Sequence, residues 1–316
     1  MIKLLLNKIK EKIISDLKNN IIESVYEMFE AQNQKNEIKQ LALGTLLSNQ
    51  QKLIMSEDIN DFEFKIFSQW GDDGIIQYLI KNLIITNNVF IEFGVQDYME
   101  SNTRFLLMQN NWTGYIMDGS EQNIKTLKSK PIYWQYNLNA KKVWITKDNI
   151  NKILNDFGIK NIGILSIDID GNDCHILKEI DLTKINPSII IVEYNSVFGC
   201  KRKISTIYNE NFDRTKAHYS NLFFGASLPA LEYICNNKGY SLVCCTKSGN
   251  NAYFVRKDLL NEKVKSKSAV EAFKLSQFRE SRDEKYNLSF IGGLERYKLI
   301  KGLEVLNIET NKIEFL

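Results

Sequence analysis

Oxygen-bearing side chains are closely spaced in two short segments near the middle of the chain. Asp168 and Asp170 stand two residues apart at the end of one apolar run, and Glu193 and Asn195 end the next. In a strand, a spacing of two puts both side chains on the same side. Carboxylates this close repel one another, and a divalent cation such as Mg²⁺ would neutralise them. Alternatively, one carboxylate caps the following helix and another pairs with a nearby arginine.

Two earlier apolar runs also end in an acidic residue close to a glycine. Glu92 is followed by Gly94, and Asp118 is followed by Gly119. A glycine at a strand end lets a ligand approach the backbone, and an acidic side chain there can accept the two hydroxyls of a ribose. Because the chain lacks a full GxGxxG motif, a pyrophosphate-binding dinucleotide site is poorly supported. Together these features favour a nucleoside ligand.

The elements that must position these residues alternate between strands and helices. The patterns predict strands over 84–93, 114–117, 132–136, 162–169 and 188–194, and helices over 99–110, 120–130, 147–157 and 173–182. Nearly continuous apolar strands separated by helices are typical of a parallel sheet covered on both faces. The prediction is therefore a doubly wound α/β fold whose ligands lie beyond the carboxyl ends of the strands.

The first 62 residues, called the N-terminal arm, have a different pattern. A second helix is expected over 38–54, with Gly44 as a possible interruption. The first helix has an apolar stripe with lysines beside it, formed by Leu5, Ile9, Ile13, Leu17, Ile21, Val25 and Met28. A stripe without a partner in its own segment predicts homodimerisation or packing on the core. Docking on an anionic membrane surface is the alternative.

Composition narrows the class of protein. The 316 residues are 44% hydrophobic and carry a formal net charge of +3, which argues against wholesale disorder and against nucleic acid as the default partner. No apolar run reaches the roughly 20 residues of a membrane-spanning helix. The five cysteines form no CxxC pair, and the first residues are interrupted by Lys and Asn too early for a secretory signal. The expected location is the cytoplasm.

Several motifs occur in one order over residues 65–316. They are Ser68–Ile76, Ile91–Val95, Asp168–Asp173, Glu193–Asn195, Gly225–Leu228, Gly249–Arg256, Phe278–Asp283 and Gly293–Arg296. In these motifs the chain resembles FkbM-like S-adenosylmethionine-dependent methyltransferases, and in particular a subgroup common in surface-polysaccharide gene clusters. The resemblance implies a Rossmann-like class I methyltransferase sheet and methyl transfer to an oxygen of a small activated sugar, used in capsule or lipopolysaccharide synthesis.

The resemblance also implies roles for individual residues in donor binding. Glu92 and Gly94 would frame the methionine end of S-adenosylmethionine, with Gln69 and Ser101 as neighbours. Asp118, with Gly119 beside it, would hold the ribose hydroxyls, and the stretch 139–143 would lie near adenine. A cap or turn role is the alternative for both Gln69 and Ser101.

Catalysis requires a group that activates a weakly nucleophilic hydroxyl. In related metal-dependent sugar O-methyltransferases, carboxylates stand at the ends of the same two strands. The resemblance thus implies Mg²⁺ or Mn²⁺ on Asp168, Asp170 and Glu193, with Asn195 as a weaker fourth ligand. His218, in a polar loop, is a candidate base, whereas His175 is expected to pack. The candidates for binding the phosphates of a nucleotide-sugar are Arg214, Arg279 and Arg282.

The expected organisation has three parts. The N-terminal arm covers 1–62, the methyltransferase core covers 63–260, and a C-terminal extension over 261–316 completes the acceptor pocket. One alternative is a metal-independent methyltransferase that uses His218 or Asp170 as the base. Another is a non-catalytic scaffold that keeps the fold. An NAD-dependent enzyme is a further rival, disfavoured by the missing glycine motif.

Overall fold

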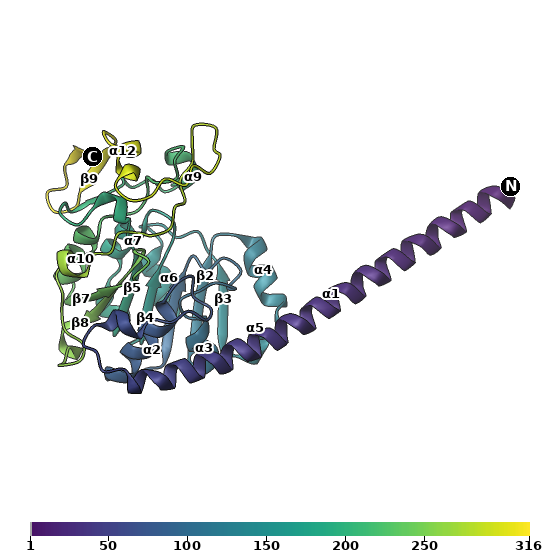
Figure 1. Cartoon of the computed structure of the whole chain (residues 1–316), viewed down its shortest axis with the longest axis horizontal. Helices are drawn as coiled ribbons and strands as arrows, with labels where there is room; N and C mark the ends of the chain where they lie inside the picture. The colour runs from purple at the N-terminus through teal and green to yellow at the C-terminus, as the bar shows by residue number, and fades with distance from the viewer. Residues whose placement is uncertain (1) are drawn as a thin grey trace.

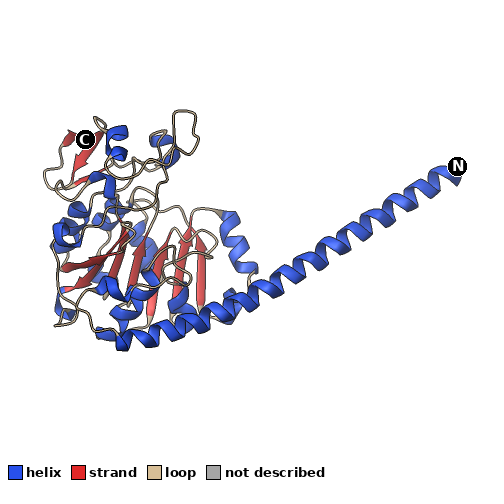
Figure 2. Ribbon diagram, in the orientation of Figure 1, coloured by secondary structure: helices blue, strands red, loops and turns tan. Residues whose placement is uncertain are grey.

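The chain folds around one large sheet with helices on both faces. The computed structural model describes the backbone of residues 2–316 and the side chains of residues 12, 16–25, 28, 29 and 31–316. The strands of the large sheet are β1 (Val89–Phe93), β2 (Thr113–Asp118), β3 (Leu138–Lys142), β4 (Ile164–Ile167), β5 (Ile189–Glu193), β7 (Tyr240–Cys245) and β8 (Asn251–Arg256). Their order is β3-β2-β1-β4-β5-β8-β7. Figure 2 shows the strands of this sheet in red and the helices that flank them in blue.

Strands β1 to β5 pair in parallel, and β8 runs antiparallel to both β5 and β7. One face of the sheet packs on α2 (Asp72–Asn82), α3 (Arg104–Asn110) and α4 (Glu121–Ser129). The other face packs on α6 (Ile150–Asp156), α7 (Asp173–Glu179), α10 (Leu228–Asn237) and α11 (Ala269–Ala272). Neighbouring strand residues point to opposite faces, as Phe90 and Ile91 do. This arrangement confirms the doubly wound, Rossmann-like α/β fold.

The third strand was predicted in the wrong place. Residues 132–136 fall in and just after α5 (Pro131–Gln135), and the strand is β3, whose bounds begin at Leu138. Pro131 occupies the first turn of that helix, where its fixed φ and missing N–H are tolerated. Residues 132–136 therefore pack beside the sheet, and Ile132 is buried in the hydrophobic core. The edge strand is formed by the more polar segment that follows, β3.

The N-terminal arm begins with one continuous helix, α1 (Ile2–Gln50), which passes through Gly44 without a break. The expected interruption at Gly44 is wrong, because this glycine marks a close contact. A Cβ at Gly44 would collide with the ring of Phe105, so the missing side chain lets α1 approach α3. Short 3₁₀ turns η1 (Gln51–Leu53) and η2 (Ile59–Phe62) then lead into the core.

Only the last part of α1, from about Glu37, packs on the body of the protein, and the rest of the helix projects away from it (Figure 1). Among the stripe residues, Leu17, Ile21, Val25 and Met28 are exposed. The side chains of the remaining stripe residues, Leu5, Ile9 and Ile13, lie outside the described residues. No described helix is both long and apolar enough to cross a bilayer.

The C-terminal part adds a small second sheet with the order β10-β9-β6, next to α12 (Glu295–Ile300). Its strands are β6 (Ile204–Ser205), β9 (Glu304–Asn307) and β10 (Ile313–Phe315). The other short elements are α8 (Leu182–Ile185), α9 (Arg214–Ala217), η3 (Ser196–Phe198) and η4 (Lys257–Leu259). Segments flanking the predicted core also enter its hydrophobic interior, through Ile59 before it and Val264 after it.

Candidate active site

A cavity of about 720 Å³ opens at the carboxyl ends of the parallel strands. The chain runs outward from β1 through β2 to β3 and then returns to β4 on the other side of β1. At such a switch point the two loops leave in opposite directions and open a crevice between them. The cavity is lined there by Gly94, Asp118 and Asp168, which follow or end three adjacent strands. The predicted ligand-binding edge of the sheet therefore coincides with a cavity at the strand ends.

Gly94 allows two neighbouring strand ends to come together. Its φ is +73°, and a Cβ at this position would overlap the carbonyl oxygen of Asp168. Any other residue would push β1 away from β4 and widen the crevice between them. The glycine predicted from the strand end is therefore required by the backbone itself.

Glu92, the acidic residue of β1, is buried and fully engaged within the chain. It accepts hydrogen bonds from the Ser101 hydroxyl at 2.6 Å and from the Asn102 N–H at 3.0 Å, and others from Thr103 and Ser166. Burial raises the pKa of its carboxyl group, and these donors oppose that shift. Glu92 therefore holds the loop that leads into α3, and Ser101 shares in that task.

A second, narrower cavity of about 100 Å³ adjoins the large one. It brings together the residues predicted around the methionine end of a donor, Gln69, Glu92, Gly94 and Ser101. Gly94 and Asp168 line both cavities, so the two lie next to each other at this point. The polar lining suits a small charged group.

The loop that carries Gln69 is fixed by Asp72 and Asp73, two buried aspartates of the Ser68–Ile76 motif. Asp73 accepts hydrogen bonds from the N–H groups of residues 66–68, and Asp72 accepts from Asn251 at 2.9 Å and from Tyr253 at 2.6 Å. Asn251 belongs to another motif of the same resemblance. Residues of both motifs thus position the loop with Gln69, which lines the narrow cavity.

Asp118 ends β2 at the edge of the large cavity. It accepts hydrogen bonds from the N–H groups of Gln96 at 2.8 Å and Ser120 at 2.7 Å. Next to it, a Cβ on Gly119 would lie 2.7 Å from the ring of Trp144. Residues 143–145 line the cavity, so the stretch predicted near adenine reaches it only at its last member, Val143.

Sequence reasoning missed Trp144, although it directly follows the stretch 139–143. Its side chain is half exposed, and its indole N–H donates to the carbonyl of Glu210 at 3.0 Å. Phe212, from the same loop as Glu210, lies against Gly171, where a Cβ would overlap its ring. Aromatic side chains from two loops therefore stand around the cavity, and the signal available in the sequence was the Trp itself after a strand.

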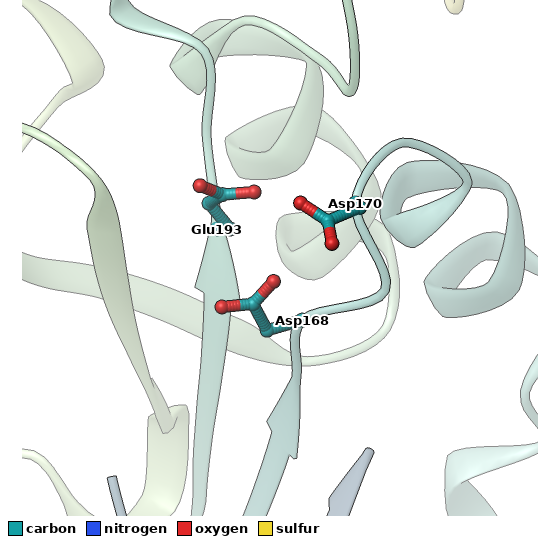
Figure 3. Close-up of side chains that lie close together, drawn as sticks. All are labelled: Asp168, Asp170 and Glu193. Atoms are coloured by element: carbon teal, nitrogen blue, oxygen red, sulfur yellow. The ribbon is translucent and has the colours of Figure 1, made fainter. Parts of the chain in front are cut away.

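Asp168, Asp170 and Glu193 converge at the ends of β4 and β5 (Figure 3). One carboxylate oxygen from each lies within 4.8 Å of the others. The expected reason for this proximity is wrong, because β4 ends at Ile167 and Asp170 lies in a turn with φ +57°. The two aspartates meet because the chain folds back, and Asp tolerates this left-handed conformation better than most residues.

Asp173 shapes that turn. One of its carboxylate oxygens accepts from the N–H of Ile169 at 2.7 Å, and the other accepts from the N–H of Gly171 at 2.9 Å. Burial raises the pKa of Asp173 to about 6. Asp173 therefore fixes the turn so that the carboxylate of Asp170 lies close to the other two carboxylates.

The charges of this trio are poorly balanced within the chain. Among the described residues, no hydrogen-bond donor reaches the carboxylate of Asp168 or of Glu193, and Oε2 of Glu193 is buried without a partner. Burial and the neighbouring carboxylates raise the pKa of both residues well above the usual range. Arg214 lies 3.6 Å from Asp170 and 3.7 Å from Glu280, and its guanidinium stacks on Phe224. The Arg pairing foreseen as an alternative thus reaches only the exposed member of the trio.

Other predicted residues have different surroundings. The Asn195 amide donates to the carbonyls of Leu222 and Phe224, and its oxygen accepts from the N–H of Val197, so its side chain is used in the loop after β5. His218 bonds Ser220 at 2.8 Å, and burial lowers its pKa. The structure does not place His218 in the lining of either strand-end cavity.

The remaining predicted side chains are engaged outside these cavities. Arg282 donates to the Tyr286 carbonyl at 2.9 Å, and Arg279 lies over the ring of Phe290. His175 is buried and bonds the Thr206 carbonyl at 2.8 Å, and burial lowers its pKa to about 4, as expected for a packing residue. All five cysteines are free, and four of them are buried.

Comparison with known proteins supports one family for the central part of the chain. Residues 118–209 match the model of the methyltransferase FkbM domain, a segment that begins at the last residue of β2 and contains β3, β4, β5 and the carboxylate trio. This match supports an S-adenosylmethionine-dependent methyltransferase and agrees with the resemblance drawn from the motifs. No curated protein sequence matches the chain.

Similar solved structures are distant in sequence. An O-methyltransferase from Bacillus cereus in complex with SAH is 12% identical, with a TM-score of 0.38, over 68% of this chain and 89% of that one. The N-terminal domain of EvdMO1 with SAH bound is 11% identical, with a TM-score of 0.34, over 53% and 72%. The ribosomal protein L11 methylase from Lactobacillus delbrueckii subsp. bulgaricus is 11% identical, with a TM-score of 0.33, over 58% and 74%.

Proposed function

We propose that this protein transfers the methyl group of S-adenosylmethionine to a hydroxyl oxygen of a sugar, assisted by a divalent cation. The observation that carries the proposal is the continuity of the site. One cavity leads from Asp118 and Gly119, suited to a nucleoside, to Asp168 and Asp170, two members of the acidic trio. A donor and a cation-held acceptor would therefore meet between β1 and β4.

The two adjoining cavities suit the two ends of the donor. We assign the adenosine to the large cavity, beside Asp118 and Trp144, and the amino-acid end to the narrow one, beside Gln69 and Ser101. The sulfonium would then lie near Gly94, where both cavities meet. Because a Cβ at Gly94 would overlap the chain at Asp168, the glycine also keeps this passage narrow.

The carboxylate trio fits Mg²⁺ or Mn²⁺. Oxygen ligands from Asp168, Asp170 and Glu193 are of the kind these ions prefer, and a cation would pair with the orphaned Oε2 of Glu193. When bound, the cation would stabilise the negative charge that develops on the sugar oxygen. Asp168, Asp170 and Glu193 would hold the cation at the ends of β4 and β5, and with it the acceptor hydroxyl.

The transfer itself forms one bond and breaks one. The sugar oxygen attacks the methyl carbon, the carbon–sulfur bond breaks, and S-adenosylhomocysteine leaves with the electron pair of that bond. The hydroxyl proton passes to a base or to solvent. Asp170 is the exposed member of the trio and the best-placed carboxylate for that role, whereas His218 lies outside the cavity lining.

The acceptor that we propose is a nucleotide-activated sugar for capsule or lipopolysaccharide synthesis in the cytoplasm. Support comes from the resemblance of the motifs and from Arg214 and Lys216, the two basic residues among those that line the large cavity, which could contact phosphates. Of the three arginines predicted to bind phosphate, only Arg214 lines this cavity.

The experiment that tests the proposal measures S-adenosylhomocysteine release from a panel of nucleotide-sugars, with Mg²⁺ or with EDTA. We expect micromolar S-adenosylmethionine binding by calorimetry and turnover of at least one sugar that stops in EDTA and returns with added metal. Full turnover after exhaustive EDTA treatment would remove the cation from the proposal and favour the metal-independent alternative. Failure to bind S-adenosylmethionine would favour a non-catalytic scaffold, and tighter binding of NAD would favour the dehydrogenase rival.

A further inference from the structure

The first 35 helical residues of the chain, 2–36, form a segment that the body of the protein does not support. We call it the projecting segment (Figure 1). Every side chain described between residues 12 and 36 is exposed, and contact with the body begins at Glu37, which pairs with the buried Arg104. A helix that stands alone in water is marginally stable unless an apolar face is covered.

The projecting segment has such a face. Leu17, Ile21, Val25 and Met28 follow one another at intervals of three or four residues, which places them on one side of the helix. Between 38% and 68% of each residue's surface is exposed to solvent. A row of large apolar side chains at this spacing is the usual contact surface of a second helix.

We propose that the projecting segment pairs with the same segment of a second copy of this chain, and that the two helices run antiparallel. The residue types are symmetric about Leu17. Counting four and eleven positions in both directions gives apolar residues on the same side of the helix each time, in the pairs Ile13 and Ile21, and Leu6 and Met28. A two-fold axis at Leu17 would therefore place these apolar positions opposite one another.

Charge determines the orientation. Residues 2–18 contain five lysines and two acidic residues, for a net charge of +3, whereas residues 19–34 contain three glutamates and no basic residue, for −3. An antiparallel pair sets the basic half of each helix against the acidic half of the other. A parallel pair would set like charges together and would be repelled. An anionic membrane would attract one half and repel the other.

The length of the projecting segment fits this arrangement. With the axis at Leu17, residue 2 of one copy lies opposite residue 32 of the other, before the body begins at Glu37. The overlap of residues 2–32 measures about 47 Å at 1.5 Å per residue. Both bodies then lie at opposite ends of the paired helices, so neither is blocked by the partner. This inference does not depend on methyl transfer.

The test uses the full-length chain in sedimentation equilibrium. We expect a dimer whose dissociation constant rises at least about tenfold in the Leu17→Asp/Ile21→Asp variant. The matched control, Asn19→Asp/Asn33→Asp, adds the same charge away from the apolar row and should change the constant less than about threefold. A wild-type monomer, or equal effects of the two variants, would overturn the proposal.

Charge reversal tests the orientation. Lys10→Glu/Lys12→Glu and Glu23→Lys/Glu27→Lys should each weaken the dimer, and the four changes together should restore it, because the halves then attract again. Oxidative crosslinking adds a second measure. Leu17→Cys, at the axis, should form a disulfide-linked dimer that neither the parent chain nor Met28→Cys forms. Crosslinking of Met28→Cys at the same rate would show parallel helices and contradict the proposal.

The membrane alternative is tested with the same proteins. Vesicles of phosphatidylcholine and phosphatidylglycerol are sedimented with the parent chain and with Leu17→Asp/Ile21→Asp. We expect the parent chain to stay in the supernatant as a dimer. A monomer that sediments with these vesicles, and loses that binding in the variant, would assign the apolar row to the lipid surface and overturn pairing between copies.

Discussion

Two sets of carboxylates stand on the same edge of the sheet, and the chain treats them in opposite ways. At β1 and β2, Glu92 and Asp118 accept hydrogen bonds from nearby N–H and hydroxyl groups. At β4 and β5, Asp168 and Glu193 receive no such bond from the described residues, and each lies close to the other's charge. In the first pair the carboxylates organise the loops around the cavity. In the second, the chain leaves the charge to be balanced by something else.

The difference separates structural from functional carboxylates on physical grounds. A buried charge that is fully hydrogen-bonded stabilises the fold around it, whereas one left without partners lowers stability. Proteins keep unpaired buried groups mainly where a ligand completes them. The comparison therefore predicts that mutations in the two sets will have different readouts, stability for the first and turnover for the second.

The largest expected effect is on folding, through Glu92. Glu92→Gln keeps the size of the side chain but replaces one acceptor oxygen with an amide that faces the donors of Ser101 and Thr103. We expect the free energy of unfolding to fall by about 3 kcal/mol, because buried donors lose a charged partner. Denaturant unfolding followed by circular dichroism measures this loss.

Glu193→Gln is the matched control for that measurement. The substitution removes a charge that has no hydrogen-bond partner and that lies near Asp168, so stability should change by less than about 1 kcal/mol or increase. Equal losses in the two variants would show that the bonded and unbonded carboxylates do not differ, and the comparison would fail.

The next effect is on turnover, through Asp168. Asp168→Asn should lower the rate of methyl transfer by about 100-fold, because the acidic trio can no longer neutralise and hold a cation fully. The dissociation constant of S-adenosylmethionine should stay within about threefold of the parent value. Single-turnover kinetics and calorimetry measure the two quantities separately.

The exposed Asp148→Asn, which lies outside both cavities, is the control for Asp168→Asn and should leave both quantities unchanged. A loss of donor binding as large as the loss of rate would instead give Asp168 a role in donor binding. The acidic trio would then not differ in function from the carboxylates at β1 and β2.

The sequence was sufficient to predict four of the five parallel strands and the strand-end residues, because both depend on local patterns. Apolar runs mark buried strands, and Gly94 and Asp118 follow directly from their position at strand ends. The sequence was not sufficient to predict features that depend on tertiary contacts. Gly44 resembles a helix break until its contact with Phe105 is known, and Asp170 reaches the trio by a turn that Asp173 closes. Nor could it show which carboxylates have partners, because the donors come from distant segments.

The smallest expected effect is on donor affinity, through Asp118. Asp118→Asn should weaken S-adenosylmethionine binding about tenfold, because the amide group can no longer accept both from the protein backbone and from ribose hydroxyls. Glu121→Gln, an exposed carboxylate three residues away in α4, should leave the affinity unchanged. If Asp118→Asn leaves the affinity unchanged but destabilises the fold, then Asp118, like Glu92, has only a structural role. The donor is then held by the surrounding loops. If the substitution changes only the affinity, the two hydrogen-bonded carboxylates have different roles. Glu92 then shapes the loop, and Asp118 also contacts the ligand.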